Sequence, residues 1–120
     1  RGAMGKIEVG EYVRTKNGII DKVESYSIGC CVWHCKNGMC IDECNRIETH
    51  LEDIVKHSKI ISEVVEKGDY VNGKLIHKID KGPNYCYLYY GNGKAFVDYQ
   101  IKTILTHEQF EQNSYKVGGE

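Results

Sequence analysis

The strongest constraint on what this chain can fold into is an internal repeat. The sequence Gly10-Glu11-Tyr12-Val13 recurs as Gly68-Asp69-Tyr70-Val71, and the segment from Cys31 to Cys44 matches the segment from Cys86 to Tyr99 without a gap, at an offset of 55. The same offset relates the Asn-Gly pairs at positions 17 and 72 and those at positions 37 and 92. A constant offset is typical of two copies of one structural unit, here of roughly 50 residues each.

Each copy has the turn signals of antiparallel β-structure. Asn-Gly favours a two-residue hairpin turn, because a type I′ turn needs positive φ at both central residues. We expect a strand on either side of each Asn-Gly pair and a last strand at Asp53 to His57 in the first copy and at Lys102 to Leu105 in the second. This predicts a mainly β fold of two tandem repeats of a small SH3-like or KOW-like antiparallel barrel or sheet. A short C-terminal helix should follow, with Thr106 as its N-cap and Gln109 completing a T-x-x-Q box.

The predicted organisation of the chain follows from the repeat. It has five parts: a cloning scar at 1–5, a first β repeat at 6–57, a linker at 58–67, a second β repeat at 68–105, and a C-terminal helix and tail at 106–120. The apolar runs are far shorter than the roughly 18 to 20 residues that a membrane-spanning helix needs, and no signal-peptide pattern precedes the first repeat. We therefore expect a soluble, cytosolic protein that does not enter membranes.

The balance of basic and acidic residues argues against a highly charged partner such as nucleic acid. The chain has 16 basic and 17 acidic residues and a formal net charge of −1, so no net field would attract nucleic acid from a distance. Basic residues could still form a local stripe, the candidates being Arg14, Lys16, Lys22, Lys36, Arg46, Lys56 and Lys59. A nucleic-acid-binding module of the SH3 or KOW type stays open as an alternative, although nucleic acid is not the expected primary partner.

Five of the six cysteines lie between Cys30 and Cys44, beside His34. If Asn37-Gly38 is a two-residue turn, residues whose numbers sum to 75 face each other, so that Cys35 lies opposite Cys40 and Cys31 opposite Cys44. The two pairs would be about 13 Å apart along the strands, too far to share one tetrahedral ion.

The second repeat offers a test of what these thiols do. The positions there that correspond to the cysteines and to Trp33 between them, Leu88 among them, are apolar or amphipathic. This indicates a buried face that includes Trp33 and Leu88, and free cysteine packs as a small hydrophobe. We predict core thiols and no cofactor. Zinc bound by Cys31, Cys35, Cys40 and Cys44, or a cross-strand disulfide or redox role, remain as alternatives.

The opposite face of the same hairpins would then carry aromatic and aliphatic side chains, which are typical of interface cores. The predicted partner-binding residues are His34, Met39 and Ile41 in the first repeat and Tyr87, Tyr89 and Phe96 in the second. Alternatively, this face packs against the other repeat or the C-terminal helix, or it forms a homodimer.

Catalytic motifs of the common hydrolase, zinc-protease and nucleotide-binding types are missing from the sequence. Five histidines and six cysteines make a chance Cys/His pair the default expectation in so small a chain. We therefore predict a protein that acts by binding, with no catalytic residues.

Four stretches carry a resemblance: Ile7 to Ile20, Asp53 to Lys59, Gly68 to Gly73, and the ending from Glu108 to Gly118. They resemble small, mostly uncharacterised accessory proteins of phages and prophages of low-GC Gram-positive bacteria. The resemblance implies counter-defence in the host bacterial cytoplasm, in the form of an anti-CRISPR inhibitor that docks on a host Cas effector through Tyr87, Tyr89 and Phe96. The alternative is a sponge that sequesters a nucleotide immune signal by aromatic stacking, helped by Arg14 or Arg46.

Overall fold

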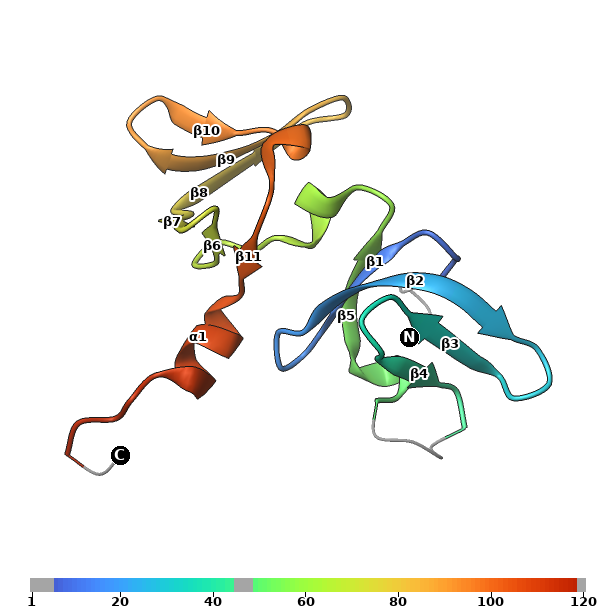
Figure 1. Ribbon diagram of the computed structural model, residues 1–120. Coiled ribbons are helices and arrows are strands. Elements are labelled where there is room, and N and C mark those ends of the chain that lie inside the picture. Colours follow the sequence, from blue (N-terminus) through green and yellow to red (C-terminus); the bar gives the residue numbers. More distant parts are fainter. Residues whose placement is uncertain (1–5, 45–48, 119–120) are drawn as a thin grey trace. The chain divides into compact units, whose positions relative to one another are not determined.

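The computed structural model describes residues 6–44 and 49–118, and the chain divides into two compact units between Val64 and Val65 (Figure 1). The predicted cloning scar at 1–5 and the predicted ligand-binding Arg46 lie outside the described residues. The described chain has three antiparallel sheets and one short α-helix, so the prediction of a mainly β fold with a short C-terminal helix is confirmed.

The first unit is built on one five-stranded sheet with the strand order β4-β3-β2-β1-β5. Its strands are β1 (Tyr12–Thr15), β2 (Ile20–Ser27), β3 (Val32–Cys35), β4 (Cys40–Asp42) and β5 (Ile54–Ser58). Two short 3-10 helices flank the last strand, η1 (Leu51–Asp53) before it and η2 (Ile61–Val64) after it. The chain thus forms four neighbouring strands in succession, turns at η1 and returns to pair with β1.

The core of the first unit centres on Trp33. Its indole Nε1 donates to the carbonyl of Ile7 at 3.2 Å, and its ring lies 4.7 Å from the ring of Tyr26. The residues packed with it are Ile7, Val13, Val23, Cys35, Ile41, Leu51 and Ile54. Because they come from every strand of the sheet, this core fixes the whole unit.

The second unit has two three-stranded sheets, ordered β10-β9-β8 and β11-β6-β7. Its strands are β6 (Tyr70–Val71), β7 (Lys74–Leu75), β8 (Lys78–Lys81), β9 (Cys86–Gly91), β10 (Lys94–Phe96) and β11 (Ile104–Leu105), with the 3-10 helix η3 (Asp98–Gln100) between the last two strands. Its buried core is formed by Val65, Val71, Ile76 and Leu88. Six partly buried side chains pack around these four: Ile79, Cys86, Tyr90, Phe96, Ile101 and Ile104.

The two units use the same hydrogen bonds at corresponding places. Gly10 donates to the carbonyl of Val23, and Gly68 donates to the carbonyl of Ile76, both at 2.8 Å. Both glycines have a positive φ, 97° and 98°, a conformation that other residues rarely adopt. In each unit a 3-10 helix precedes the last strand, which pairs back onto the first.

The predicted C-terminal helix is α1 (His107–Asn113). Thr106 is its N-cap, and its Oγ1 accepts a hydrogen bond from Gln109 N at 3.2 Å, as the sequence indicates. Phe110 on this helix stacks on Tyr70 with the ring centroids 5.2 Å apart, which ties α1 to β6. Among the described residues, no helix has the length and apolar character needed to cross a membrane.

The predicted hairpin register is wrong by one residue. The structure pairs Trp33 with Ile41 and His34 with Cys40, so that facing residues sum to 74 rather than 75. The cause is the turn: Cys35 N donates to Met39 O at 2.8 Å and Gly38 has a φ of 101°, which makes Lys36-Asn37-Gly38 a three-residue loop. A one-residue shift of this kind moves every side chain of the following strand to the opposite face.

Only one of the four Asn-Gly pairs has the two positive φ angles of the expected type I′ turn. Asn72 and Gly73 both have positive φ, 52° and 79°, and Val71 pairs directly with Lys74. At position 17 the loop is longer, since Thr15 N donates to Ile19 O at 2.9 Å. The Asn-Gly pairs at 17 and 72 are therefore not structurally equivalent, although their sequence offset suggests it.

Candidate functional site

The register change redistributes the six predicted partner-binding residues. Ile41 is fully buried (0% exposed), and Met39 and Phe96 pack against the cores of their units, so the expected exposure of these three is wrong. Phe96 pairs with the buried Leu88 and stacks on Tyr90 with the centroids 4.4 Å apart. The remaining three, His34, Tyr87 and Tyr89, lie on faces that point away from the cores.

Three tyrosines form a row on the surface of the second unit. Tyr85 precedes β9, and Tyr87 and Tyr89 alternate along it on the side opposite Leu88. The ring centroids are 5.4 Å apart for Tyr85 and Tyr87 and 6.3 Å apart for Tyr87 and Tyr89. Tyr85 is 46% exposed and Tyr87 is 38% exposed. We call these three residues the tyrosine face.

The neighbouring strand supplies charges of both signs to the tyrosine face. Lys78 is paired with Tyr89, and its Nζ lies 5.3 Å from the centroid of the Tyr89 ring. Asp80 is paired with Tyr87. The result is an aromatic strip bordered by a cation and an anion, which suits a mixed polar and apolar partner surface.

Gly82 determines where the ring of Tyr85 lies. A Cβ at Gly82 would fall 2.1 Å from Cε2 of Tyr85, so only glycine lets the ring take this position. The backbone closes the same turn, because Gly82 N donates to Tyr85 O at 2.9 Å. The first member of the tyrosine face is thus placed by the turn that leads into β9.

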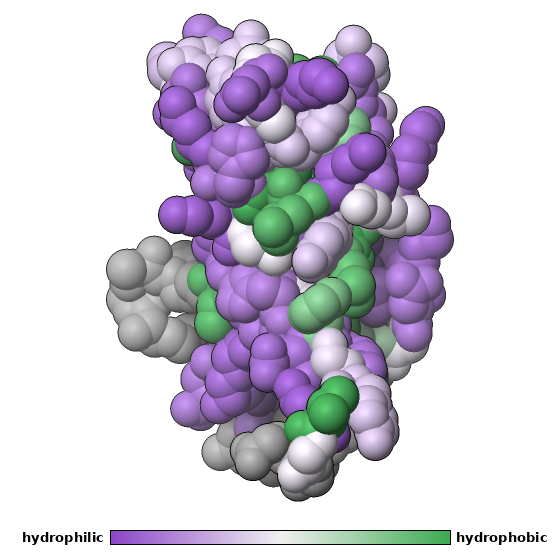
Figure 2. Space-filling view, turned by 90° about the vertical axis from the view of Figure 1, so that its left-hand side faces the viewer, coloured by the Kyte–Doolittle hydropathy of each residue, from purple (hydrophilic) through white to green (hydrophobic). Residues whose placement is uncertain are grey.

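Strongly hydrophobic residues do not dominate the side of the protein drawn in Figure 2. The apolar residues coloured there occur as patches interrupted by polar ones. Ile28 and Val117, each 82% exposed, lie in a loop and in the tail, and the other exposed aliphatic side chains of the described chain are less than 50% exposed. Amphipathic tyrosines, rather than a broad aliphatic patch, are therefore the better candidates for a contact surface.

The cysteines do not form the predicted pairs. Cys35 is buried in the first core, whereas Cys40, expected beside it, lies on the other face with its Sγ 3.5 Å from Nδ1 of His34. Nε2 of His34 is 3.0 Å from Oγ of Ser27. The core-thiol interpretation therefore holds for Cys35 and is wrong for Cys40, because β4 is turned over by the three-residue loop.

The other two cysteines of the predicted set lie at the far end of the hairpin. Cys31 has a positive φ of 56° and its Sγ is 3.7 Å from the carbonyl of Ile28. Cys44 is exposed, and its backbone N donates to Asp42 at 2.6 Å. In the described part of the chain, Cys31, Cys35, Cys40 and Cys44 do not bring three ligand atoms together.

Burial controls the ionisation of Cys35. It raises the pKa of this thiol to about 12, and the nearby carboxylate of Asp21 and the thiol of Cys40 act in the same direction. Cys35 is thus a neutral core thiol at physiological pH.

Arg14 is not available for the ligand-binding role that the sequence suggests. Its side chain is completely buried (0% exposed), and Nη1 donates to the carbonyl of Val64 at 2.9 Å. Two lysines of the proposed basic stripe are also engaged: Lys16 lies 3.0 Å from Asp53 and Lys59 lies 3.2 Å from Glu8. The local positive charge of the first unit is accordingly reduced.

A depression of about 500 Å³ opens beside the β1–β2 turn of the first unit. It is lined by Thr15, Lys16, Asn17, Ile19, Thr49 and Asp53. Ile19 is the one aliphatic residue in this lining, whereas small-molecule sites are mostly apolar. The depression therefore ranks below the tyrosine face as a functional site.

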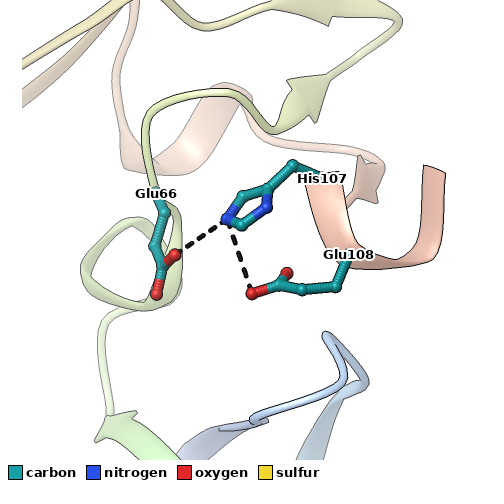
Figure 3. A group of neighbouring side chains, drawn as sticks. All are labelled: Glu66, His107 and Glu108. Carbon is teal, nitrogen blue, oxygen red and sulfur yellow. Dashed lines mark hydrogen bonds and ion pairs between the residues drawn. The ribbon is translucent and has the colours of Figure 1, made fainter. Parts of the chain in front are cut away.

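A second cluster of chemical interest lies where α1 begins (Figure 3). Nε2 of His107 is 3.0 Å from Oε1 of Glu66 and 3.4 Å from Oε2 of Glu108. This is the one group of three potential metal-ligating side chains whose donor atoms converge within 4.8 Å among the described residues. No local sequence pattern reveals this group, because Glu66 lies about 40 positions before His107 and Glu108 and all three lie outside the cysteine-rich segment.

Comparison of the chain with protein-family models, with curated proteins and with solved structures found no match.

Proposed function

We propose that this protein acts by binding and that it captures a protein partner through the tyrosine face of its second unit. The observation that carries the proposal is the contiguous row Tyr85, Tyr87 and Tyr89 on the side of β9 that faces away from the core. Tyrosine is enriched at the centres of protein interfaces, because it contributes a large apolar area and a polar end at low entropic cost.

Two features favour a protein partner over nucleic acid. Lys78 lies over the ring of Tyr89, where a stacked base would have to insert, and Asp80 stands beside Tyr87, where it would repel a phosphate. The net charge of −1 supplies no long-range attraction for a polyanion. The buried Arg14 argues in the same way against a nucleotide sponge built on that residue.

The resemblance to phage accessory proteins supplies the first partner to test. On that basis we propose a counter-defence protein of the host bacterial cytoplasm, an anti-CRISPR inhibitor that docks on a Cas effector. Of the three anchors suggested by sequence, Tyr87 and Tyr89 keep this role, Tyr85 joins them, and Phe96 is replaced because it belongs to the core.

The proposal is tested by co-expressing the protein with each CRISPR system of its host in a plasmid-interference assay. We expect the native chain to reduce interference by one system, and the double variant Tyr87→Ala/Tyr89→Ala to restore it. Tyr115→Ala is the matched control, since Tyr115 is an exposed tyrosine of the same unit outside the face, and it should behave as the native chain. Full interference by every system in the presence of the native chain would reject the Cas effector as partner.

A gel shift separates the nucleic-acid alternative from the proposal. Binding to single- or double-stranded nucleic acid that weakens steeply between low and moderate salt, and that depends on Tyr87 and Tyr89, would favour the alternative. The proposal expects no such salt-dependent binding.

We also infer that each unit is a small SH3-like barrel and that the two are tandem copies. The support is the strand order β4-β3-β2-β1-β5 of the first unit, its 3-10 helix before the last strand, and the matching hydrogen bonds of Gly10 and Gly68. In the second unit, β7 and β8 together occupy the place of β2, and β11 pairs with β6 as β5 pairs with β1.

A further inference from the structure

We propose that Glu66, His107 and Glu108 form a binding site for a transition-metal dication, for which Zn²⁺ is the best fit. The three side chains come from two segments of the second unit, the turn before β6 and the first turn of α1 (Figure 3). Their donors are one imidazole nitrogen and two carboxylate oxygens, a set that zinc accepts in proteins together with a water molecule.

The spacing of the donor atoms supports this assignment. With zinc–ligand bonds of about 2.0 to 2.1 Å, two ligands of a tetrahedral ion are about 3.3 Å apart. The distances from Nε2 of His107 to Glu66 and to Glu108 are 3.0 and 3.4 Å. The donor atoms of all three residues lie within 4.8 Å of one another, so a small rotation of the carboxylates completes the triangle.

A single hydrogen on Nε2 of His107 cannot form a good hydrogen bond to both carboxylates. Nε2 carries at most one hydrogen, and the 3.0 Å contact with Glu66 is a good hydrogen bond, whereas 3.4 Å to Glu108 is longer than a normal one. Two carboxylates around one nitrogen also bring two negative charges together. A dication in place of the proton would contact both carboxylates and balance their charge.

The backbone under the site is held by a buried residue. Asp69 is fully buried, and its two carboxylate oxygens accept hydrogen bonds from Glu66 N at 2.7 Å and His107 N at 3.0 Å. Asp69 therefore holds together the two segments that supply the donors.

A comparison with the first unit shows that the histidine and the second carboxylate are found in the second unit alone among the described residues. Glu8 occupies the place of Glu66, since Glu8 N donates to Glu11 as Glu66 N donates to Asp69. Glu8 forms an ion pair with Lys59 at 3.2 Å, and a lysine ammonium ion cannot bind a metal. In the second unit, Glu66 instead contacts the imidazole of His107, which also lies 3.4 Å from the carboxylate of Glu108, so that three donors replace a simple ion pair.

The site is tested by zinc titration of the full chain, using calorimetry and equilibrium dialysis. All the variants keep the cysteines, so any zinc bound by thiols is common to them, and the relevant quantity is the difference between the variants. We expect His107→Ala and Glu108→Gln to weaken one equivalent of zinc binding at least about tenfold. His77→Ala, which removes an exposed histidine of the same unit, is the matched control and should bind as the native chain.

Cobalt substitution identifies the ligands of that equivalent. The His107-dependent Co²⁺ should lack the intense sulfur-to-metal charge-transfer bands that thiolate ligands produce. Equal zinc binding by the native chain and His107→Ala, or thiolate bands in the His107-dependent equivalent, would overturn the proposal. Circular dichroism of His107→Ala should show a folded protein, because the hydrogen bond to Asp69 uses the backbone N of residue 107.

Discussion

At the scale of single residues, side chains of the same type have different roles within each unit. Cys35 is a neutral core thiol, whereas Cys40, five positions later, lies beside His34 on the other face. Tyr90 packs on the core, whereas Tyr89 belongs to the tyrosine face. In both cases the face of the strand on which the residue lies decides its chemistry, and this makes single-residue predictions possible.

Raising the pH should destabilise the first unit through Cys35. The unfolded thiol loses its proton near its ordinary pKa of 9.0, whereas the folded one keeps it up to about pH 12, so the folded state binds more protons in this interval. The free energy of unfolding should therefore fall by about 1 kcal/mol between pH 9 and pH 10. Denaturant titrations at the two pH values measure it, and Trp33 fluorescence reports on this unit.

The matched variants for this prediction are Cys35→Ala and Cys30→Ala. The first removes the buried thiol and should lose this part of the pH dependence, whereas the second removes an exposed thiol and should keep it. The comparison of stabilities stops at pH 10, because Tyr26 adds its own pH dependence above that value. Desolvation and the neighbouring Cys31 and Glu43 raise the pKa of Tyr26 from 10.0 to about 12. An equal slope in Cys35→Ala and the native chain would show that another group is responsible.

Gly82→Ala should alter the tyrosine face without unfolding the protein. The new Cβ would meet the outer ring atoms of Tyr85, which can rotate away, so the stability should change by no more than about 1 kcal/mol. The contact between the rings of Tyr85 and Tyr87 should be lost, and with it the nuclear Overhauser effects between them. Gly29→Ala is the control, because a Cβ there has open space. Retained ring contacts in Gly82→Ala would mean that the turn itself can shift.

At the scale of elements, the sequence predicted the helix and a strand on either side of each Asn-Gly pair. It predicted neither β8 as a separate strand nor the faces on which the side chains of two hairpin strands lie. The alternation in β3 and β9 correctly placed Trp33 and Leu88 inside. The faces of β4 and β10 depended on turn geometry, and Asn-Gly is compatible both with a two-residue turn and with a longer loop in which only the glycine has positive φ. This ambiguity about the turn is the reason why Ile41, Phe96 and Cys40 were all predicted on the wrong face of their strands.

Only part of the candidate site could be predicted, because some of its residues do not depend on the turn type and others depend on tertiary contacts. Tyr87 and Tyr89 lie on β9, before the turn, so their side of the strand did not depend on the turn type. Tyr85 was missed because its place depends on the packing against Gly82, and the group around His107 because it needs long-range contacts of Asp69. Neither contact has a local sequence signal.

The 3-10 helix η1 should depend on Asp53, which closes it in two ways. Its Oδ2 accepts a hydrogen bond from His50 N at 3.0 Å, and its Oδ1 lies 3.0 Å from Nζ of Lys16. We expect Asp53→Ala to lower the free energy of unfolding by about 1 to 2 kcal/mol, and Asp53→Asn to cost less because the amide oxygen still accepts. Thermal denaturation followed by Trp33 fluorescence measures both.

The same element gives a test at low pH. The hydrogen bond from His50 N, followed by the contact with Lys16, lowers the pKa of Asp53 below its ordinary value of 3.8. The contribution of the carboxylate is present above pH 3.8 and is lost as the pH falls through the lower folded-state pKa. The difference in stability between the native chain and Asp53→Asn should therefore shrink below about pH 3.8. A difference that stays constant would show that the charge does not contribute.

At the scale of the whole molecule, each unit has a core of its own. The first is centred on Trp33 and Ile41 and the second on Leu88 and Ile76. Small domains bury a modest fraction of their surface and are marginally stable, so the loss of one large core side chain is serious for either unit. Since the sequence contains one tryptophan, Trp33, its fluorescence reports on the first unit alone.

Leu88→Ala should therefore destabilise the second unit and leave the first one folded. Leu88 is fully buried, and its truncation should cost about 2 to 5 kcal/mol, comparable to the whole stability of a domain this small. Hydrogen exchange followed by mass spectrometry should show faster exchange in peptides from the second unit, while the midpoint of the Trp33 fluorescence transition stays where it is. Ile41→Ala, the reciprocal variant in the first core, should move that midpoint and spare the second unit. If Leu88→Ala lowers the Trp33 midpoint as much as Ile41→Ala does, the two units unfold as one cooperative body, and a binding site on the second unit would then draw on the stability of both.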